Sequence, residues 1–466
     1  MAYIGTKPTI GNFQICDAIS VVNGQAAYTM QVGSVNVIPQ SANHMIVSLN
    51  GTIQKPNSSF TVSGSTITFS SNLATGDVID FIQILGDVLD LGVPSDATVT
   101  TAKLADNNVT TAKLAYNPNP NRNIIINGDM SIAQRGTSES GVGASDVYLI
   151  DRFQLDTNAT PSARFTISQD TDVPSGQGFS KSLKLDCTTA QTSYSSNQLV
   201  AVVQRIEGQM LQYLKYGTSS AESLTLSFWV KSNKTGTYTL ELDQAGNAKD
   251  YSQTYTISSA DTWEKKTLTF NGDTATALAN DNTEELEVNF WLAAASDFTS
   301  GTLNTSWNST VNANRVSSSQ VNIADSTSNE WYVTGVQLEA GTSASEFEFL
   351  PVDVNLQRCQ RYFQMYVEGG NTSSKIPIAL TAYGSNNATG GVPYYAEMRA
   401  SPSGSHSNVT CNYGGGTTSI TGISYYATAY ASGMDITVTG QSWSTGRCVT
   451  IQYSATNAYM RFDAEL

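Results

Sequence analysis

Apolar and polar residues alternate at every second position over much of this chain, a pattern typical of half-buried β-strands. Residues 45–49 read Met-Ile-Val-Ser-Leu and precede Asn50 and Gly51, which favour a hairpin turn because both accept positive φ. Only 14% of the residues are charged, and Ser, Thr, Asn and Gly, which favour turns over helices, supply most of the other polar positions. We therefore predict an all-β, multi-domain protein with few, short helices.

The charge distribution limits the partners. The net charge is −15, and residues 121–360 hold most of it, with 15 basic and 27 acidic groups. Nucleic-acid binding needs a basic surface, so we expect none. No apolar stretch of about 18 residues occurs, so we expect no membrane insertion.

The cysteines and the N-terminus indicate synthesis in the cytoplasm. The five cysteines are odd in number, widely spaced and never in a CxxC pattern, so we expect free thiols rather than a disulfide framework or zinc site. The sequence begins MAYIGTKPTIGNF, without a secretion signal.

The first 93 residues carry a specific resemblance. From His44 to Leu85 the chain has a strand, NG, a Q-x-P turn, FTVSGSTITF and L-x-x-GD-x-I. This run resembles the virion-proximal module of podovirus-type tail fibres, especially those of marine bacteriophages. The resemblance implies that residues 1–93 form a small β domain that docks on phage tail proteins, an adaptor or nozzle.

A ten-residue repeat follows, with VTTAKLA at Val99 and again at Val109. Its apolar positions are too sparse for one chain to bury, whereas several copies wound together could bury them. The repeat resembles the thin stems of trimeric fibres, which implies that residues 94–121 form a stem of a homotrimer. If extended, it would span about 90 Å at ~3.3 Å per residue. A flexible linker is the alternative.

Residues 122–351 resemble the jelly-roll, carbohydrate-binding type of β-sandwich found between stem and tip in phage tail proteins. The matching segments are NGDM, LTLSFWVKS, W-x-K-x-T-L-T-F and GVQLEAG, in that order. The resemblance implies the fold but fixes no ligand.

Residue phasing separates two tryptophans from the expected core. In 224–230 and 286–292 the aliphatic and phenylalanine residues share one strand face, which leaves Trp229 and Trp291 on the other. An outward indole can stack on a sugar and donate a hydrogen bond. Packing against a neighbouring subunit or under a loop is the alternative for both. Trp263, Trp307 and Trp331 have no clear phase.

One acidic cluster could supply oxygen ligands for calcium, although a solvated loop explains it as well. Its members are Asp281, Glu284, Glu285 and Glu287. We predict no cofactor and no metal site.

Residues 352–466 are predicted to form a β-rich receptor-binding tip. Residues 354–364 suggest a short helix and resemble the CQRYF segment that joins sandwich to C-terminal domain in phage tail proteins. Residues 361–466 contain 11 of the 22 tyrosines among small polar residues, a composition suited to recognition and also to filling strands. Candidate ligand-binding tyrosines are Tyr383, Tyr394, Tyr395, Tyr413, Tyr425 and Tyr426. The last strand, 458–466, is expected to be ordered in a trimeric tip.

We expect no enzyme. Only His44 and His406 occur, which excludes HExxH and disfavours a Ser-His-Asp triad, and no GxSxG or P-loop is present. Together these features predict a bacteriophage tail fibre that joins the virion and binds host surface polysaccharide or an outer-membrane receptor. A glycan-cleaving depolymerase and a purely structural tail component are the alternatives, because two carboxylates suffice for a glycosidase.

Overall fold

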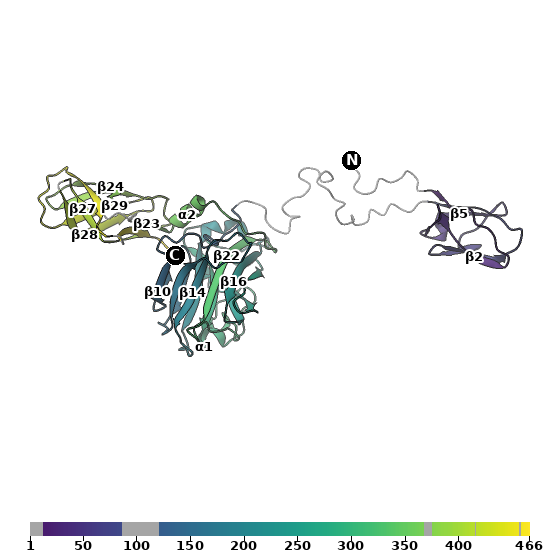
Figure 1. The fold of residues 1–466 in the computed structure, drawn as a ribbon, viewed down its shortest axis with the longest axis horizontal. Helices are drawn as coiled ribbons and strands as arrows, with labels where there is room; N and C mark the ends of the chain where they lie inside the picture. The colour runs from purple at the N-terminus through teal and green to yellow at the C-terminus, as the bar shows by residue number, and fades with distance from the viewer. Residues whose placement is uncertain (1–12, 86–120, 368–374, 415, 456–457) are drawn as a thin grey trace. The chain divides into compact units, whose positions relative to one another are not determined.

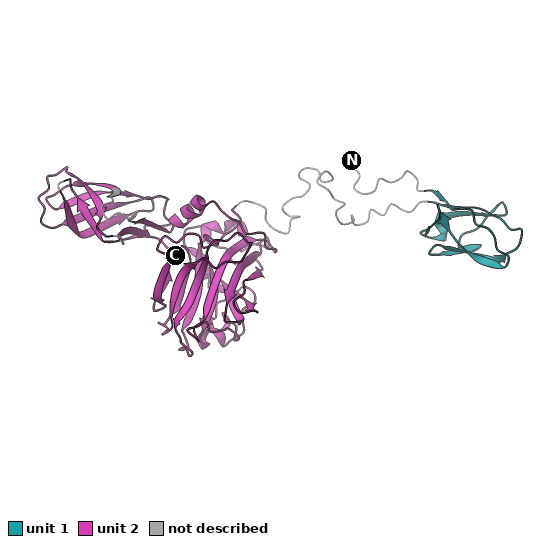
Figure 2. Ribbon diagram, in the orientation of Figure 1, with its two compact units in different colours: residues 1–110 teal, residues 111–466 magenta. Residues whose placement is uncertain are grey.

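The computed structural model describes residues 13–85, 121–367, 375–414, 416–455 and 458–466. The chain divides into two compact units, Met1–Thr110 and Thr111–Leu466 (Figure 2). The predictions for the stem repeat lie outside the described residues. The predicted division into four parts stays a prediction, whereas the all-β, multi-domain class is confirmed by the strands described below.

The first unit consists of short antiparallel strands around a small core. A four-stranded sheet has the order β1-β9-β5-β6, a three-stranded sheet the order β2-β8-β7, and β3 and β4 form a hairpin. Figure 1 labels one strand of each of the two larger sheets, β5 and β2. The elements are β1 (Gln14–Ile15), β2 (Gln25–Thr29), β3 (Gln31–Val32), β4 (Val35–Asn36), η1 (Ala42–His44), β5 (Met45–Leu49), β6 (Thr52–Ile53), β7 (Phe60–Ser63), β8 (Thr66–Leu73) and β9 (Ile79–Ile84).

The turns of this unit lie where the sequence predicts them. Asn50 and Gly51 have φ of 51° and 73° and join β5 to β6, and Gly64, at φ 58°, joins β7 to β8. A β-carbon resists these φ values in most residues, so the placement of Asn and Gly fixes the register of the hairpins.

Two antiparallel sheets packed face to face form the sandwich of the second unit. The six-stranded sheet has the order β10-β13-β14-β22-β16-β19, and the seven-stranded sheet the order β11-β12-β15-β20-β17-β18-β21. The strands are β10 (Ser138–Val142), β11 (Val147–Tyr148), β12 (Gln154–Asn158), β13 (Arg164–Asp170), β14 (Ser182–Thr189), β15 (Leu199–Glu207), β16 (Leu224–Ser232), β17 (Gly236–Gln244), β18 (Lys249–Ile257), β19 (Glu264–Phe270), β20 (Glu284–Ala294), β21 (Asn308–Ser309) and β22 (Glu330–Ala340). Short helical turns connect them: η4 (Gly208–Met210), η5 (Gln212–Leu214), η6 (Ala245–Asn247), α1 (Ser296–Thr299) and η7 (Asn312–Asn314).

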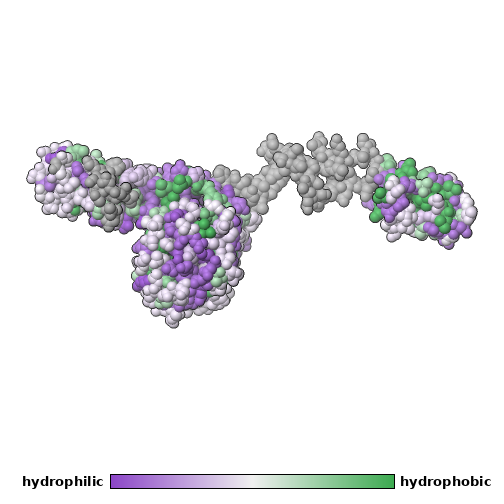
Figure 3. Space-filling model, viewed as in Figure 1, coloured by the Kyte–Doolittle hydropathy of each residue, from purple (hydrophilic) through white to green (hydrophobic). Residues whose placement is uncertain are grey.

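The core between the sheets follows the predicted alternation. Leu226 and Phe228 on β16 meet Val288 and Phe290 on β20 in one buried cluster. The Phe228 and Phe290 rings lie edge to face with centroids 5.1 Å apart, a geometry that adds to the burial of apolar area. The outer surface of the sandwich is by contrast mostly hydrophilic in the view of Figure 3.

A short helix and nine strands follow the sandwich. The helix α2 (Val352–Gln360) ends before the predicted limit at 364, because Phe363 already starts a strand that pairs with β31. A three-stranded sheet has the order β23-β31-β26, and six strands close into a barrel, β24-β25-β29-β28-β27-β30. Their bounds are β23 (Phe363–Val367), β24 (Lys375–Ala382), β25 (Asn387–Pro393), β26 (Ser403–Ser407), β27 (Val409–Asn412), β28 (Thr417–Ala427), β29 (Ala431–Val438), β30 (Cys448–Tyr453) and β31 (Tyr459–Asp463).

The cysteines are all free, as predicted. Four are buried among apolar side chains and Cys448 is exposed. Among the described residues, no helix combines the length and apolar character that a membrane crossing requires.

Candidate functional site

The two outward tryptophans differ in how far they are covered. Both lie opposite the core-facing residues of their strands, as predicted. Trp229 is half-buried on the outer face of the six-stranded sheet, where its backbone pairs with Lys265 of β19 and Thr334 of β22. Its position leaves part of the indole available to a ligand.

Trp291 is covered on the outer face of the seven-stranded sheet. It is 2% exposed and packs on Phe298 of α1, with ring centroids 5.4 Å apart. Its Nε1 donates a 3.0 Å hydrogen bond to Glu241, and the Arg315 guanidinium lies 5.3 Å from its ring. No ring face is open to a sugar, so Trp291 corresponds to the alternative of packing under a loop.

A row of aromatic and cationic side chains crosses the six-stranded sheet near Trp229. Lys231 Nζ lies 4.2 Å from the Tyr332 ring centroid and 5.8 Å from that of Trp263. The Trp263 indole donates a 2.9 Å hydrogen bond to Asp172, which also forms an ion pair with Lys231. Tyr332 and Lys231 are therefore mostly covered, and Trp263 is the partly exposed member of the row.

The row continues on β14 with a second lysine. Lys184 Nζ bonds Glu330 at 2.8 Å and lies 5.4 Å from the Tyr332 ring, while the Tyr332 hydroxyl donates to Glu330 at 2.6 Å. Lys231 and Lys184 thus each have an opposite charge beside them. The face offers Trp229, Trp263 and hydroxyl groups to a ligand, with no net excess of cations among these pairs.

Glu284 and Glu287 of the predicted acidic cluster take part in an ion-pair network, whereas Asp281 is exposed in the loop before β20. Arg205 Nε lies 2.7 Å from Glu287 and 3.3 Å from Glu284. Burial and the neighbouring Glu287 raise the pKa of Glu284 to about 9, so Glu284 holds a proton that it shares with Glu287. Glu285 is buried, and Asp281 accepts bonds from Thr283.

The network extends across the same sheet. Arg315 bonds Glu241 at 2.7 Å and Asp243 at 2.9 Å, and burial together with Glu241 raises the pKa of Asp243 to about 7. In the described residues, no group of three or more His, Cys, Asp or Glu side chains is arranged to hold a metal ion.

The C-terminal tyrosines divide into exposed and packed sets. Tyr383, Tyr395 and Tyr426 are 51%, 55% and 61% exposed, and Tyr430, in the turn after β28, is 70% exposed. These rings project from the barrel and its connections, where a ligand can reach them. The structure thus leaves three of the six candidate tyrosines open.

The other three candidates pack within the tip. Tyr394 and Tyr425 both lie against Phe462, with centroids 5.0 Å and 5.5 Å apart, and Tyr413 lies 6.2 Å from Trp443. Tyr425 also contacts His406, with 3.2 Å between its hydroxyl and Nδ1. The interpretation as strand filling therefore fits Tyr394, Tyr413 and Tyr425, whereas ligand contact by the exposed tyrosines stays a prediction.

Two exposed tyrosines border a small polar surface on the barrel. The Tyr426 hydroxyl donates to Asp435 at 3.4 Å, and the Asp435 charge raises the pKa of Tyr426, with a further contribution from Tyr383. Backbone pairing places small residues around Asp435 and beside Tyr426: Thr389, Gly391, Ser424 and Gly433. We call Tyr383, Tyr426, Asp435 and these four residues the tyrosine patch. It combines flat aromatic rings, a carboxylate acceptor and hydroxyl donors.

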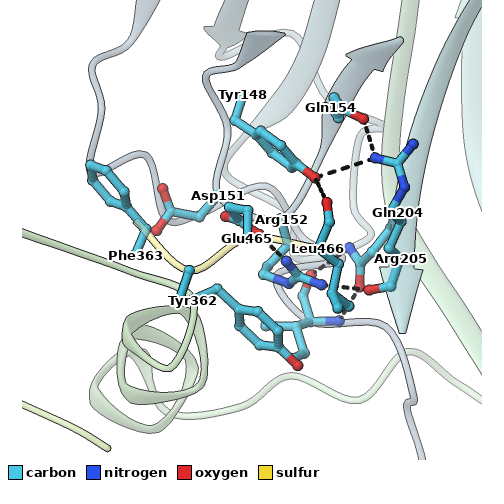
Figure 4. Close-up of polar contacts among 12 residues, drawn as sticks. Tyr148, Asp151, Arg152, Gln154, Gln204, Arg205, Tyr362, Phe363, Glu465 and Leu466 are labelled. Atoms are coloured by element: carbon cyan, nitrogen blue, oxygen red, sulfur yellow. Dashed lines mark hydrogen bonds and ion pairs between the residues drawn. The ribbon is translucent and has the colours of Figure 1, made fainter. Parts of the chain in front are cut away.

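A buried charged cluster links sandwich and tip, and no sequence pattern indicated it. Arg152, 1% exposed, forms an ion pair with Glu465 and lies with its guanidinium carbon 3.5 Å from the Tyr362 ring centroid (Figure 4). Arg135 lies 3.6 Å from the Phe363 ring and bonds Glu465 at 3.2 Å. Glu465, Tyr362 and Phe363 lie more than 200 residues away from these arginines in the sequence, so no local spacing could reveal these contacts.

Comparisons with known proteins found likeness in structure alone. No protein-family model matches the sequence, and no curated protein does. A tailspike protein domain of bacteriophage CBA120, described as enzymatically active, matches with 18% identity and a TM-score of 0.26 over 48% of this chain and 22% of that chain.

Carbohydrate-binding modules also match. A family 4 module covers 46% of this chain and 97% of its own, with 13% identity and a TM-score of 0.24. A family 11 module of Clostridium thermocellum, solved with a mixed-linked β-1,3-1,4 tetrasaccharide, covers 45% and 98%, with 10% identity and a TM-score of 0.23.

Proposed function

We propose that this chain is a trimeric bacteriophage tail fibre that docks on the virion through residues 1–93 and binds host surface glycan through the tyrosine patch. The observation that carries the binding role is the exposure of Tyr383 and Tyr426 beside Asp435. A large exposed aromatic ring is costly in water, and stacking on the apolar face of a sugar removes that cost. Asp435 accepts hydrogen bonds from the sugar hydroxyls.

The mechanism is multivalent. One patch of this size buries little area and binds weakly, but three copies on one fibre raise the effective concentration at the cell surface. The fibre belongs to the virion and is made in the host cytoplasm. Trp229 and Trp263 provide a second, weaker glycan contact on the sandwich.

We propose attachment without cleavage. Retaining glycosidases hold their two carboxyl groups about 5 Å apart, and inverting ones farther apart, to leave room for the sugar or a water. Glu284 and Glu287 are hydrogen-bonded to each other and share Arg205, so no reacting atom fits between them. Incubation of the protein with host polysaccharide tests this, because a shortened polymer contradicts the proposal and favours a depolymerase.

The binding experiment uses the full chain and purified host polysaccharide. Tyr383→Ala and Tyr426→Ala should each weaken binding by about tenfold, the loss of one stacking contact of roughly 1–1.5 kcal/mol. Tyr213→Ala is the matched control, because Tyr213 is 46% exposed but lies in η5 of the sandwich. Equal binding by all three variants would remove the tyrosine patch from the proposal.

A second experiment separates adhesion from a purely structural role. Phage that carry the Tyr383→Ala and Tyr426→Ala fibre should assemble normally and adsorb more slowly. Normal adsorption by these particles would support a structural component. Chemical cross-linking of the purified chain tests the trimer.

A further inference from the structure

The four-stranded sheet of the first unit has an apolar outer face. Backbone pairing sets Ile15 and Ile46 on either side of Gln83, so all three side chains point the same way. The next row sets Phe81 opposite Ser48, and Ser48 opposite Ile53. Alternation along the chain adds Phe13, two residues before Ile15, to the same side. Five large apolar residues thus share this face, which we call the outer face.

Four of the five apolar residues of the outer face are exposed, whereas Ile46 is half-buried and Ser48 is buried. Phe13, Ile15, Ile53 and Phe81 are 63%, 65%, 59% and 39% exposed. The opposite face of the sheet is already buried, because Met45, Val47 and Ile82 belong to the core. An antiparallel sheet normally turns polar residues to water on its free side. An apolar cluster of this kind is typical of an interface.

We propose that the outer face is a contact surface between copies of this chain. This deepens the proposed trimer by naming the surface that forms it, and it rests on that proposal. The packed outer faces would bury the Phe81, Ile15 and Ile53 side chains of each copy against those of the others. Burial of such side chains stabilises the association of the copies by roughly 25 cal/mol per Å² of apolar area removed from water.

The described part of the unit carries few charges. Residues 13–85 carry Lys55 and three aspartates, and one of these, the exposed Asp80, reaches the outer face because its carboxylate accepts a hydrogen bond from the Ser48 side chain. Asp80 accepts bonds from Ser48 at 2.8 Å and the Gly51 amide at 2.7 Å, and Asp17 accepts from the Gly33 and Ser34 amides at 2.9 Å and 2.7 Å. Each copy therefore brings the Asp80 carboxylate to the outer face, where the hydrogen bonds from Ser48 and Gly51 hold it in place.

The sequence after β9 favours a second copy as the occupant. Val99, the first apolar position of the VTTAKLA repeat, lies 15 residues after Ile84. In the sequence, the apolar positions of that repeat are too sparse for one chain to bury, a pattern that favours copies lying side by side. A linkage this short gives the outer faces of neighbouring copies a high effective concentration, so a face too small to associate alone can associate in the trimer.

The test measures thiol accessibility in the full chain, with Cys448→Ser as background because the other four cysteines are buried. Phe81→Cys probes the outer face. Val35→Cys is the matched control, because Val35 is 69% exposed and lies in the separate β3–β4 hairpin. Labelling by a maleimide is followed over time, and sedimentation velocity gives the oligomeric state of the same samples.

The proposal predicts a trimer in which Phe81→Cys reacts about tenfold more slowly than Val35→Cys, and in which a short bis-maleimide links chains through Phe81→Cys only. Equal labelling rates of the two variants in a trimer would contradict the proposed role of the outer face but not the proposed trimer. Protection in a monomer would show that the chain covers its own face. A trimer with fast labelling that becomes slow only in the virion would assign the face to a tail protein instead.

Discussion

Removal of the Glu465 charge should loosen the junction between sandwich and tip. The Glu465 side chain is 5% exposed and pairs with Arg152, whose side chain is 1% exposed. Without that carboxylate, the Arg152 guanidinium keeps the Arg205 carbonyl at 2.5 Å and the Tyr362 ring, but no anion. Loss of one partner from a buried pair costs about 3–5 kcal/mol, because the remaining charge stays desolvated. Glu465→Gln keeps the shape and one acceptor, so we expect it to lower the free energy of unfolding by about 3 kcal/mol.

Asp463→Asn is the matched control. Asp463 bonds Arg135 Nη2 at 3.1 Å, as Glu465 does at 3.2 Å, but its side chain is 38% exposed. Exposed ion pairs contribute about 0–1 kcal/mol to stability, so Asp463→Asn should change the free energy of unfolding very little. The two variants remove the same charge from the same strand end, and they differ mainly in burial.

Equilibrium unfolding of the full chain in urea, followed by tryptophan fluorescence and by far-ultraviolet circular dichroism, measures both effects. Glu465→Gln should lower the midpoint and separate the two signals, because the barrel then unfolds without the sandwich. Equal free energies of unfolding for the two variants would refute the reasoning, since burial would then not govern the cost.

Four further substitutions probe the sandwich. Glu284→Gln mimics the protonated acid and should raise the free energy of unfolding at pH 8 by about 1–2 kcal/mol, but not at pH 4. The reason is that the unfolded chain releases this proton near pH 4.5 and the folded chain only near pH 9. Urea unfolding at the two pH values checks the sign. Trp291→Ala should lower the free energy of unfolding by about 3–5 kcal/mol and Trp229→Ala by about 1 kcal/mol, because only Trp291 is fully covered. Urea unfolding measures both. Gly335→Ala should lower the free energy of unfolding by about 2–4 kcal/mol, because Gly335 has a φ of +62° and a β-carbon there would lie 2.6 Å from the Phe179 ring. An unchanged melting temperature would contradict this.

Local chemistry accounts for the parts of the fold that the sequence predicts. The φ values of Asn50 and Gly51 are a property of those two residues, so the hairpin is visible without any tertiary information. The same holds for the core face of β16 and β20, since a period of two needs only the strand itself. Outward placement of Trp229 and Trp291 follows from the same period.

Whether an outward residue stays open depends on distant segments. Trp291 is covered by Phe298 of α1 and by Arg315, which lie between β20 and β22 in a segment whose position no alternation encodes. Tyr425 and Tyr426 are adjacent in β28 and therefore point to opposite faces, but alternation does not say which face is covered. Phe462 of β31 packs on Tyr425, whereas Tyr426 is exposed. The sequence could therefore predict a tyrosine-rich surface, but it could not sort its members.

The buried charged cluster of Arg135, Arg152 and Glu465, which links sandwich and tip, would affect how the tyrosine patch binds. An apolar contact between sandwich and barrel could slide, whereas Arg152 and Arg135 each hold Glu465 through directional bonds while stacking on a ring, which fixes both translation and rotation. Multivalent binding gains most when the sites are held at a fixed separation, because flexible linkage spreads the effective concentration over a larger volume. A buried charge pair is a weak source of stability compared with apolar packing. The cluster is therefore better explained as a device that orients the barrel on the sandwich than as one that merely stabilises the fold.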